Sequence, residues 1–331
     1  MAQMKYFYEL TVSSSPHAHS PVTTQTLMRD VLIALLPALV GSVYFFGFRA
    51  LLVTAVSAAA CVFFEWIYRK LMHKDSTVYD CSAVVTGVLL AFVCPVTIPY
   101  WCILIGDFFA IVVVKQLFGG IGKNFMNPAL AARAFLFSWP VLMSNWVKVG
   151  FSNAAGLLDT ADVVTAATPL SSMHQGMLPT DSLMDLWIGR VGGCIGETSA
   201  LLLLIGGGYL LIRKVITPRI PLAFIGTVAV LTFLFPQGND RLAWMAAQIL
   251  SGGLMLGAIF MATDYVTSPL TGKGQLLYGI GCGVLTVAIR YFGSYNEGVS
   301  YAILVMNACV MLLDNVGHPV KFGAGKEAGR K

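Results

Sequence analysis

Residues 162–170, Asp-Val-Val-Thr-Ala-Ala-Thr-Pro-Leu, carry a hydroxyl group whose neighbours could permit a covalent modification. The two alanines leave the Thr168 hydroxyl unobstructed, and Pro169 biases Thr168 away from the α region, toward an extended or turn backbone. Asp162 adds a carboxylate upstream, so a bulky enzyme or cofactor could approach the hydroxyl. The residues alone favour a second interpretation, in which Asp162 caps a short helix and the threonines bond backbone donors.

Asp107 is a second candidate, because it lies within the apolar stretch 98–118. A carboxylate at bilayer depth costs several kcal/mol unless it is paired, protonated or hydrated. Lys115 lies about 12 Å further along a helix axis, too far for a direct pair. Arg133 is a possible partner. Asp107 is therefore either half of a structural ion pair or a step in a cation or proton pathway.

Composition identifies the setting of these residues as a membrane. Of 331 residues, 57% are hydrophobic and 11% are charged, whereas soluble domains carry about 25% charged residues. The formal net charge is +5, but the basic residues lie in short loops rather than in one patch, which argues against nucleic acid as a partner. No two histidines have HExxH spacing and no cysteines form a CxxC pair, so we expect no metal site.

The predicted fold is an all-α polytopic membrane protein with about ten transmembrane helices. The third span is short and ends at Cys94-Pro95. Glu65 and Glu197 lie near span ends, where we expect them to face interfacial water or another subunit. The predicted spans are 31–48, 50–68, 82–95, 98–118, 129–147, 196–212, 220–236, 243–262, 274–292 and 299–314.

Charge distribution orients these spans. With a cytoplasmic N-terminus, 14 Lys and Arg residues fall inside and five outside, as the positive-inside rule requires. Five spans lie on each side of the long loop. Because each half has an odd number of spans, the two halves have opposite orientations, as in a 5+5 inverted repeat. The expected divisions are a cytoplasmic N-terminal segment (1–30), a first transmembrane half (31–147), an extracytoplasmic loop (148–195), a second half (196–314) and a cytoplasmic tail (315–331).

The loop motif resembles a known flavin-attachment signal, Asp-x-x-(Ser/Thr)-(Gly/Ala)-Ala-(Thr/Ser). Asp162, Thr165, Ala166, Ala167 and Thr168 match it position by position, although Gly is commoner at the position of Ala166. The resemblance implies that an FMN transferase outside the cytoplasm joins the phosphate of FMN to Thr168 by a phosphoester.

Four further segments resemble the family that contains the D subunits of Rnf complexes and the B subunits of sodium-pumping NADH:quinone oxidoreductases. The segments are DCSAVVTGVLLAF from 80, GGIGKNFMNPALAARAFL from 119, GGLMLGAIFMATDYVTSPLTGKGQLLYGIGCGVLTVAIRYFG from 252 and EGVSYAILVMNA from 297. The short N-terminus favours the Rnf subunit. A non-redox inverted-repeat transporter or channel is the alternative from a different class.

The resemblance implies a membrane electron carrier, not catalytic alone, in a complex that couples ferredoxin and NAD chemistry to Na⁺ or H⁺ movement across the bacterial or archaeal cytoplasmic membrane. The NAD and ferredoxin sites would lie in partner chains, since a Rossmann fingerprint is absent. The implied partners are iron–sulfur subunits, a second flavinylated subunit, the FMN transferase and membrane lipid.

The segment 122–130, GKNFMNPAL, has two interpretations. Asn127 could cap the fifth span, with Pro128 at its first helical position. Alternatively, Asn124 and Asn127 could line a cavity at a half-helix end. Because relatives hold a non-covalent riboflavin near the cytoplasmic face, the resemblance makes these asparagines candidates for a second flavin site.

Overall fold

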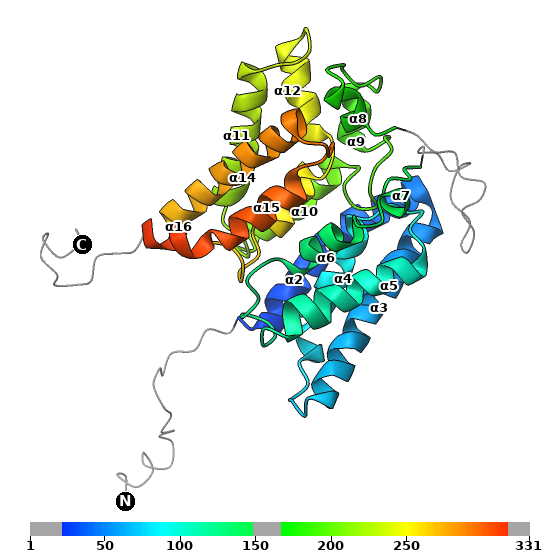
Figure 1. The fold of residues 1–331 in the computed structure, drawn as a ribbon, viewed down its shortest axis with the longest axis vertical. Coiled ribbons are helices and arrows are strands. Elements are labelled where there is room, and N and C mark those ends of the chain that lie inside the picture. Colours follow the sequence, from blue (N-terminus) through cyan, green and yellow to red (C-terminus); the bar gives the residue numbers. More distant parts are fainter. Residues whose placement is uncertain (1–21, 148–166, 317–331) are drawn as a thin grey trace, which may run out of the picture.

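The computed structural model describes residues 22–147 and 167–316, and within these two ranges every regular element is a helix (Figure 1). Asp162, Thr165 and Ala166 lie outside the described residues. The elements before the long loop are α2 (Thr24–Phe46), α3 (Phe48–Leu71), the 3-10 helix η1 (Val78–Asp80), α4 (Ser82–Phe92), α5 (Tyr100–Phe108), the π-helix η2 (Phe109–Gln116), α6 (Pro128–Leu136) and α7 (Pro140–Met143).

The elements after it form a second set of helices. They are α8 (Pro169–His174), α9 (Leu183–Ile188), α10 (Ala200–Ile212), α11 (Arg219–Leu234), α12 (Arg241–Leu250), α13 (Leu254–Leu256), the π-helix η4 (Gly257–Met261), α14 (Gly272–Phe292), α15 (Val299–Ala308) and α16 (Val310–Val316). In Figure 1, α16 lies at the left, whereas α7, α8 and α9 lie toward the right.

Helix occurs in each of the ten predicted ranges, but four of the predicted spans were wrong in their bounds or continuity: the first, the fifth, and the spans 243–262 and 299–314, which break after Leu250 and after Ala308. The first helix begins at Thr24 rather than at residue 31. The Thr23 side chain caps this helix by accepting a hydrogen bond from the Thr26 N–H. The fifth span is not continuous over 129–147, because α6 ends at Leu136 and a separate short helix starts at Pro140. A proline at the first position of a helix is favourable, but inside one it removes a backbone hydrogen bond.

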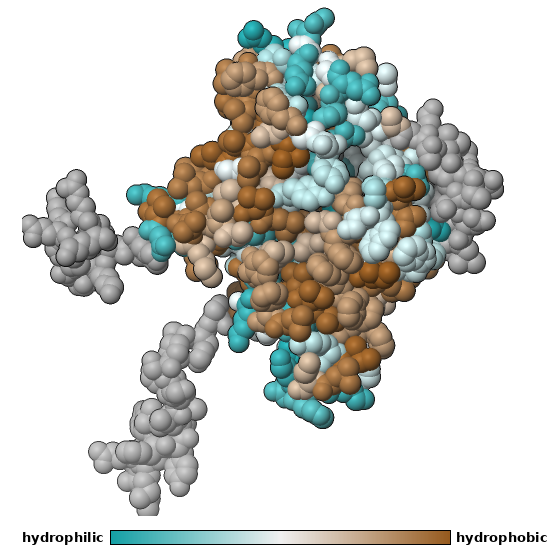
Figure 2. Space-filling view, viewed as in Figure 1, coloured by the Kyte–Doolittle hydropathy of each residue, from teal (hydrophilic) through white to brown (hydrophobic). Residues whose placement is uncertain are grey.

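The chain is a multi-pass helical membrane protein. Helices α2, α3 and α14 are long and apolar enough to cross a bilayer, and two bent pairs qualify if each is one span. Those pairs are α12 with α13–η4, bent by 62°, and α15 with α16, bent by 63°. Large apolar side chains on these helices are exposed, and Figure 2 shows hydrophobic surface over α14–α16, with hydrophilic surface at the tips of the molecule. The count of ten spans stays a prediction.

Packing follows the same order before and after the long loop. Helix α3 packs on α4 and α5, and α6 packs on η2; likewise α11 packs on α12 and α14, and α15 packs on α14. The two sets meet where α2 packs on α10 and α6 packs on α15. At the α2–α10 crossing, a Cβ at Gly206 would lie 2.1 Å from the Ala34 carbonyl oxygen, so only glycine permits this approach.

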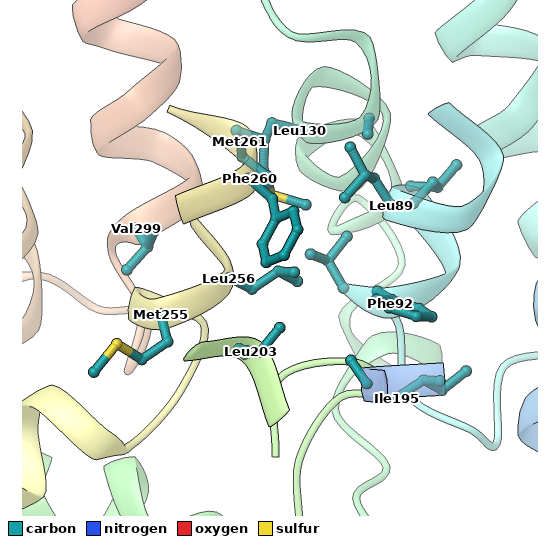
Figure 3. Packing of buried hydrophobic residues seen from close by; sticks show 14 of the residues in the cluster. Leu89, Phe92, Leu130, Ile195, Leu203, Met255, Leu256, Phe260, Met261 and Val299 are labelled. Carbon is teal, nitrogen blue, oxygen red and sulfur yellow. The ribbon is translucent and has the colours of Figure 1, made fainter. Parts of the chain in front are cut away.

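The apolar core lies between the two sets. In Figure 3, Phe260 of η4 lies in the middle of the cluster, with Leu256 of α13, Leu89 of α4 and Leu130 of α6 around it. All four belong to one cluster of buried side chains. The core therefore holds the two sets together as one body, and it separates two cavities.

Candidate functional site

Two cavities lie near opposite ends of α6. We call them the Asn124 cavity, which Pro128 and Ala129 line at the start of α6, and the Thr168 cavity, which Phe137 lines just after its end. Their volumes are about 90 and 220 Å³. Nine helical residues advance about 13 Å, so α6 sets the separation of the two cavities.

Thr168 has the backbone that Pro169 predicts. Its φ and ψ are −76° and 153°, an extended conformation, and it directly precedes α8. The side chain makes no capping hydrogen bond; instead the Thr168 carbonyl accepts bonds from the Ser171 N–H at 2.9 Å and Ser171 Oγ at 2.6 Å. Thr168 is partly exposed, Ala167 is exposed and Pro169 is buried. Among the described residues the Thr168 side chain therefore bonds no backbone donor of α8, whereas the predicted cap by Asp162 lies outside the described residues.

One wall of the Thr168 cavity is aromatic. Tyr295 and Tyr301 stack with their ring centroids 5.4 Å apart, and Phe137 meets Tyr295 edge-on at 6.0 Å. Trp146 also lines the cavity. Aromatic faces pack well against flat conjugated rings.

Glu197 and Glu297 line the cavity, and Arg133 of α6, which is 2% exposed, lies behind them; we call these three side chains the charged floor of the cavity. Arg133 donates to Glu297 in a short ion pair, lies 3.5 Å from Glu197, and donates to Ser300 Oγ at 2.7 Å. Glu197 precedes α10 and Glu297 precedes α15, so one guanidinium joins the first half of the chain to two segments of the second.

Several polar atoms around this floor have no hydrogen-bond partner among the described residues. They are Glu197 Oε2, Ser251 Oγ, Arg133 Nε and Arg290 Nε. Glu197 and Ser251 themselves line the cavity. Buried polar atoms are nearly always satisfied, so this end of the molecule offers polar groups that a bound molecule or water can use.

These contacts correct two expectations. Arg133 is not the partner of Asp107, because it is committed to Glu197 and Glu297. Glu65 and Glu197 do not face interfacial water. Glu197 is 5% exposed beside Arg133, and Glu65 is 1% exposed and pairs with Lys115 at 3.0 Å. In each case a basic residue on a distant helix makes burial of the acid tolerable.

Asp107 of α5 is fully buried, and within the described ranges it forms no ion pair. Ser57 Oγ lies 2.6 Å from Asp107 Oδ1 and 2.9 Å from the Gly87 carbonyl oxygen. A hydroxyl carries one hydrogen, so both contacts are full hydrogen bonds only when Asp107 carries a proton and donates it to Ser57. The ion-pair interpretation of Asp107 is wrong, and the geometry suits the neutral acid.

The Asn124 cavity contains both predicted asparagines. Asn127 caps α6, accepting from the Ala129 N–H at 3.0 Å, with Pro128 at the first helical position as predicted. It also donates to the Met261 carbonyl at 3.3 Å, which ties α6 to η4. Asn124 donates to the Met126 carbonyl at 3.2 Å. Asn127 is thus structural, while both residues also line the cavity.

Other polar side chains line the Asn124 cavity, among them Lys115 and Ser82. Lys115 Nζ donates to Ser82 Oγ at 2.6 Å and to Glu65 Oε2 at 3.0 Å. Ser82 Oγ in turn donates to Asp80 Oδ1 at 2.6 Å. A buried chain of polar groups therefore leads from this cavity into the space between α3, α4 and η2.

Sequence reasoning missed Glu297 and the tyrosines 295 and 301. Glu297 stands in a polar turn and looks like any solvated loop acid. The sequence offers one useful signal: an arginine inside a predicted span, such as Arg133, needs a carboxylate partner. The spacing of residues along the chain does not show which acid reaches it.

Comparison with known proteins places these features in a family. Residues 11–323 match the model of the NQR2, RnfD, RnfE family. The chain is 47% identical to the D subunit of the Na⁺-translocating ferredoxin:NAD⁺ oxidoreductase complex of Acetobacterium woodii, over 96% of each chain.

Two other relatives carry similar names. The chain is 41% identical to the D subunit of the proton-translocating ferredoxin:NAD⁺ oxidoreductase complex of Clostridium ljungdahlii, over 95% of this chain and 96% of the relative. It is 35% identical to the D subunit of the ion-translocating oxidoreductase complex of Actinobacillus succinogenes, over 95% and 98%. The names of the Acetobacterium and Clostridium relatives specify different ions.

Proposed function

The chain belongs to the NQR2, RnfD, RnfE family, and on this premise we propose that it is the D subunit of an ion-translocating ferredoxin:NAD⁺ oxidoreductase complex. The subunit carries electrons through a flavin held in the membrane domain, and it works with iron–sulfur subunits and a second flavinylated subunit. Near-full-length identity of 47% and 41% to subunits with this name supports the proposal. Because those two names give Na⁺ and H⁺, the family assignment leaves the ion open.

We further propose that Thr168 carries FMN through a phosphoester, with the flavin ring in the Thr168 cavity. One observation carries this proposal: the Thr168 side chain does not cap α8, and Thr168 lines the same cavity as the stacked Tyr295 and Tyr301. The exposed Ala167 leaves room for the FMN transferase to reach the hydroxyl. Asp162 and Thr165 complete the recognition motif in this proposal.

The residues of the cavity suit this cofactor. Bound FMN supplies one- and two-electron transfer. Thr168 Oγ1 would hold its phosphate, Pro169 would anchor the attachment point in the protein, and Tyr295, Tyr301 and Phe137 would restrain the ring.

Thr168→Val should abolish covalent FMN while the chain still inserts in the membrane, because valine keeps the shape and lacks the nucleophilic oxygen. In-gel ultraviolet fluorescence of the denatured chain, followed by peptide mass spectrometry, measures this. Ser171→Ala, outside the recognition motif, is the matched control and should keep one FMN per chain. A Thr168→Val chain that stays fluorescent would place the attachment elsewhere.

The Asn124 cavity is the proposed site of a second, non-covalent flavin, riboflavin. The support for this proposal is that the Asn124 and Asn127 amides, the Lys115 ammonium and apolar side chains from both halves line one cavity. Amide and ammonium groups can donate to the carbonyl oxygens of a flavin ring.

In the Thr168→Val background, acid extraction should release riboflavin without phosphate, close to one per chain. Adding Asn124→Leu should reduce the amount at least tenfold, since leucine removes the amide and narrows the cavity, whereas Asn127 is left alone because it caps α6. Chromatography of the extract against flavin standards provides the measurement. A Thr168→Val chain that releases no flavin would exclude the second flavin site.

Asp107 is proposed as a step in the ion pathway. Two observations support this proposal: Asp107 is buried without an ion pair among the described residues, and it contacts Ser57. Both suit a carboxyl group that gains and loses a proton or exchanges it for a cation. A carboxyl group with these properties at bilayer depth is a functional candidate by default.

Asp107→Asn should lower ion uptake per electron at least tenfold in vesicles containing the intact complex, because the amide cannot alternate between charged and neutral forms. Reduced ferredoxin and NAD⁺ drive the reaction, and ²²Na⁺ and a pH-sensitive dye report the two candidate ions. The exposed Asp75→Asn is the control and should behave as the wild type. Unchanged uptake in Asp107→Asn would exclude Asp107 from the pathway.

We propose ten spans in a 5+5 inverted repeat, with both termini in the cytoplasm and Thr168 outside it. The repeated packing order and the pairing of α2 with α10 and of α6 with α15 support this arrangement. In addition, the third and fifth predicted spans of each half are short, broken or bent.

A membrane-impermeant maleimide should label Ala167→Cys but not Lys74→Cys in intact cells, because the first would lie outside and the second in the cytoplasmic loop after α3. Both variants are made in a chain whose Cys81 and Cys309, the two described cysteines that are not buried, are replaced by serine. Labelling of Lys74→Cys without permeabilisation would reverse the orientation.

A further inference from the structure

Two acids share one cation on the floor of the Thr168 cavity. Arg133 contacts both Glu297 and Glu197, and no other Lys or Arg of the described residues forms an ion pair with either. With both acids ionised, the three side chains carry a net charge of −1 inside the protein. One added proton makes the group neutral.

The two carboxyl groups are not equivalent. Glu297 Oε1 accepts the Gly253 N–H at 2.8 Å, and its other oxygen takes the short contact with Arg133. Burial alone would raise the pKa of Glu297, but Arg133 and these hydrogen bonds hold it below its ordinary value. Glu297 is therefore the member that stays ionised.

Glu197 has much weaker support for a negative charge. Its Oε1 lies 3.5 Å from Arg133, at the limit of a hydrogen bond, and its Oε2 has no partner among the described residues. The side chain is 3% exposed and lines the cavity. An ionised oxygen buried without a donor is costly, so Glu197 gains most from a proton.

The two acids also lie side by side. A Cβ at Gly253 would lie 2.5 Å from Glu197 Oε2 and 2.4 Å from Glu297 Oε1, so both carboxyl groups converge on this glycine. Glu197 Oε2 and Glu297 Oε1 are therefore at most about 4.9 Å apart, the sum of 2.4 and 2.5 Å. Neighbouring carboxyl groups bind one proton between them more readily than isolated ones.

We propose that Glu197 Oε2 is the proton-binding site that compensates the charge of the flavin in the Thr168 cavity. With flavin bound and reduced by one electron from a partner redox centre, Glu197 would take up one proton from bulk solvent, while Arg133 and Glu297 would keep their charges. On reoxidation Glu197 would return the proton to the solvent. This inference rests on the proposed attachment of FMN to Thr168, and Glu197 acts as a positioning residue that tunes the cofactor.

The surrounding groups are compatible with this role. Cys194 Sγ donates to the Val93 carbonyl at 3.2 Å rather than holding a charge. Arg290 of α14 donates to Gln248 and Ser251 carbonyls where α12 ends, so its charge is directed at that helix terminus. The titratable or charged groups that face Glu197 are Arg133 from α6, Cys94 from the segment after α4, Cys194, Glu297, Arg290 from α14, and Tyr295 and Tyr301.

Redox titration of the purified full-length flavinylated chain tests the proposal. The signal followed is the flavin transition that is present in the wild type and missing in Thr168→Val. Over the range in which Glu197 changes protonation, the midpoint potential should fall by up to 59 mV per pH unit more steeply in the wild type than in Glu197→Gln, as one proton per electron requires. The exposed Asp181→Asn is the control and should keep the wild-type slope.

Infrared difference spectroscopy provides a second test whose main signal comes from the wild type, so it does not depend on a variant that folds. Reduction of the wild type should produce a protonated-carboxyl band that shifts in D₂O, and this band should be absent from Glu197→Gln. A wild type without this band, equal slopes in wild type and Glu197→Gln, or a potential that follows Na⁺ concentration instead of pH would overturn the proposal. A chain with no covalent flavin would instead contradict the attachment at Thr168, so the two failures are distinguishable.

Discussion

The ion pair between Arg133 and its two carboxylates is the interaction on which the Thr168 end of the molecule depends. The guanidinium is buried on α6, and its partners precede α10 and α15, so three distant segments meet at one charge. Removing one partner of such a buried group leaves an uncompensated charge and costs about 3–5 kcal/mol. The same contact fixes the floor of the cavity, so stability and the geometry of the site are coupled.

Broken helices provide space for the Thr168 cavity. Continuous helices satisfy every backbone group internally, and a bilayer tolerates irregular backbone only where protein or a cavity covers it. Here the interruptions after α4, between α6 and α7, and at 251–253 lie beside the cavities or the apolar core. Arg290 and Glu297 bond the backbone beside the break at 251–253. Polar side chains thus stabilise this interruption in an apolar environment.

The sequence predicted the parts of this structure that depend on local chemistry. Apolar runs indicated where helices lie, Asn127-Pro128 indicated the start of α6, and Pro169 indicated the extended backbone of Thr168. Contacts between distant segments were not predictable in the same way. Arg133 was assigned to Asp107, and Glu197 was expected in water, because spacing along one chain does not show which helices become neighbours. In the sequence, Glu297 looks like a loop acid, and Tyr295 and Tyr301 look like ordinary aromatics in a loop or helix. Only the fold shows that all three line one cavity.

We place a flavin, attached to Thr168, in the cavity above the Arg133 floor. A density map of the intact complex that resolves side chains tests this placement most directly. We expect density continuous with Thr168 Oγ, leading to a flat ring against Tyr295, Tyr301 and Phe137. Ring density that points away from this cavity, or a well-resolved Thr168 with no attached group in a complex that contains FMN, would contradict it.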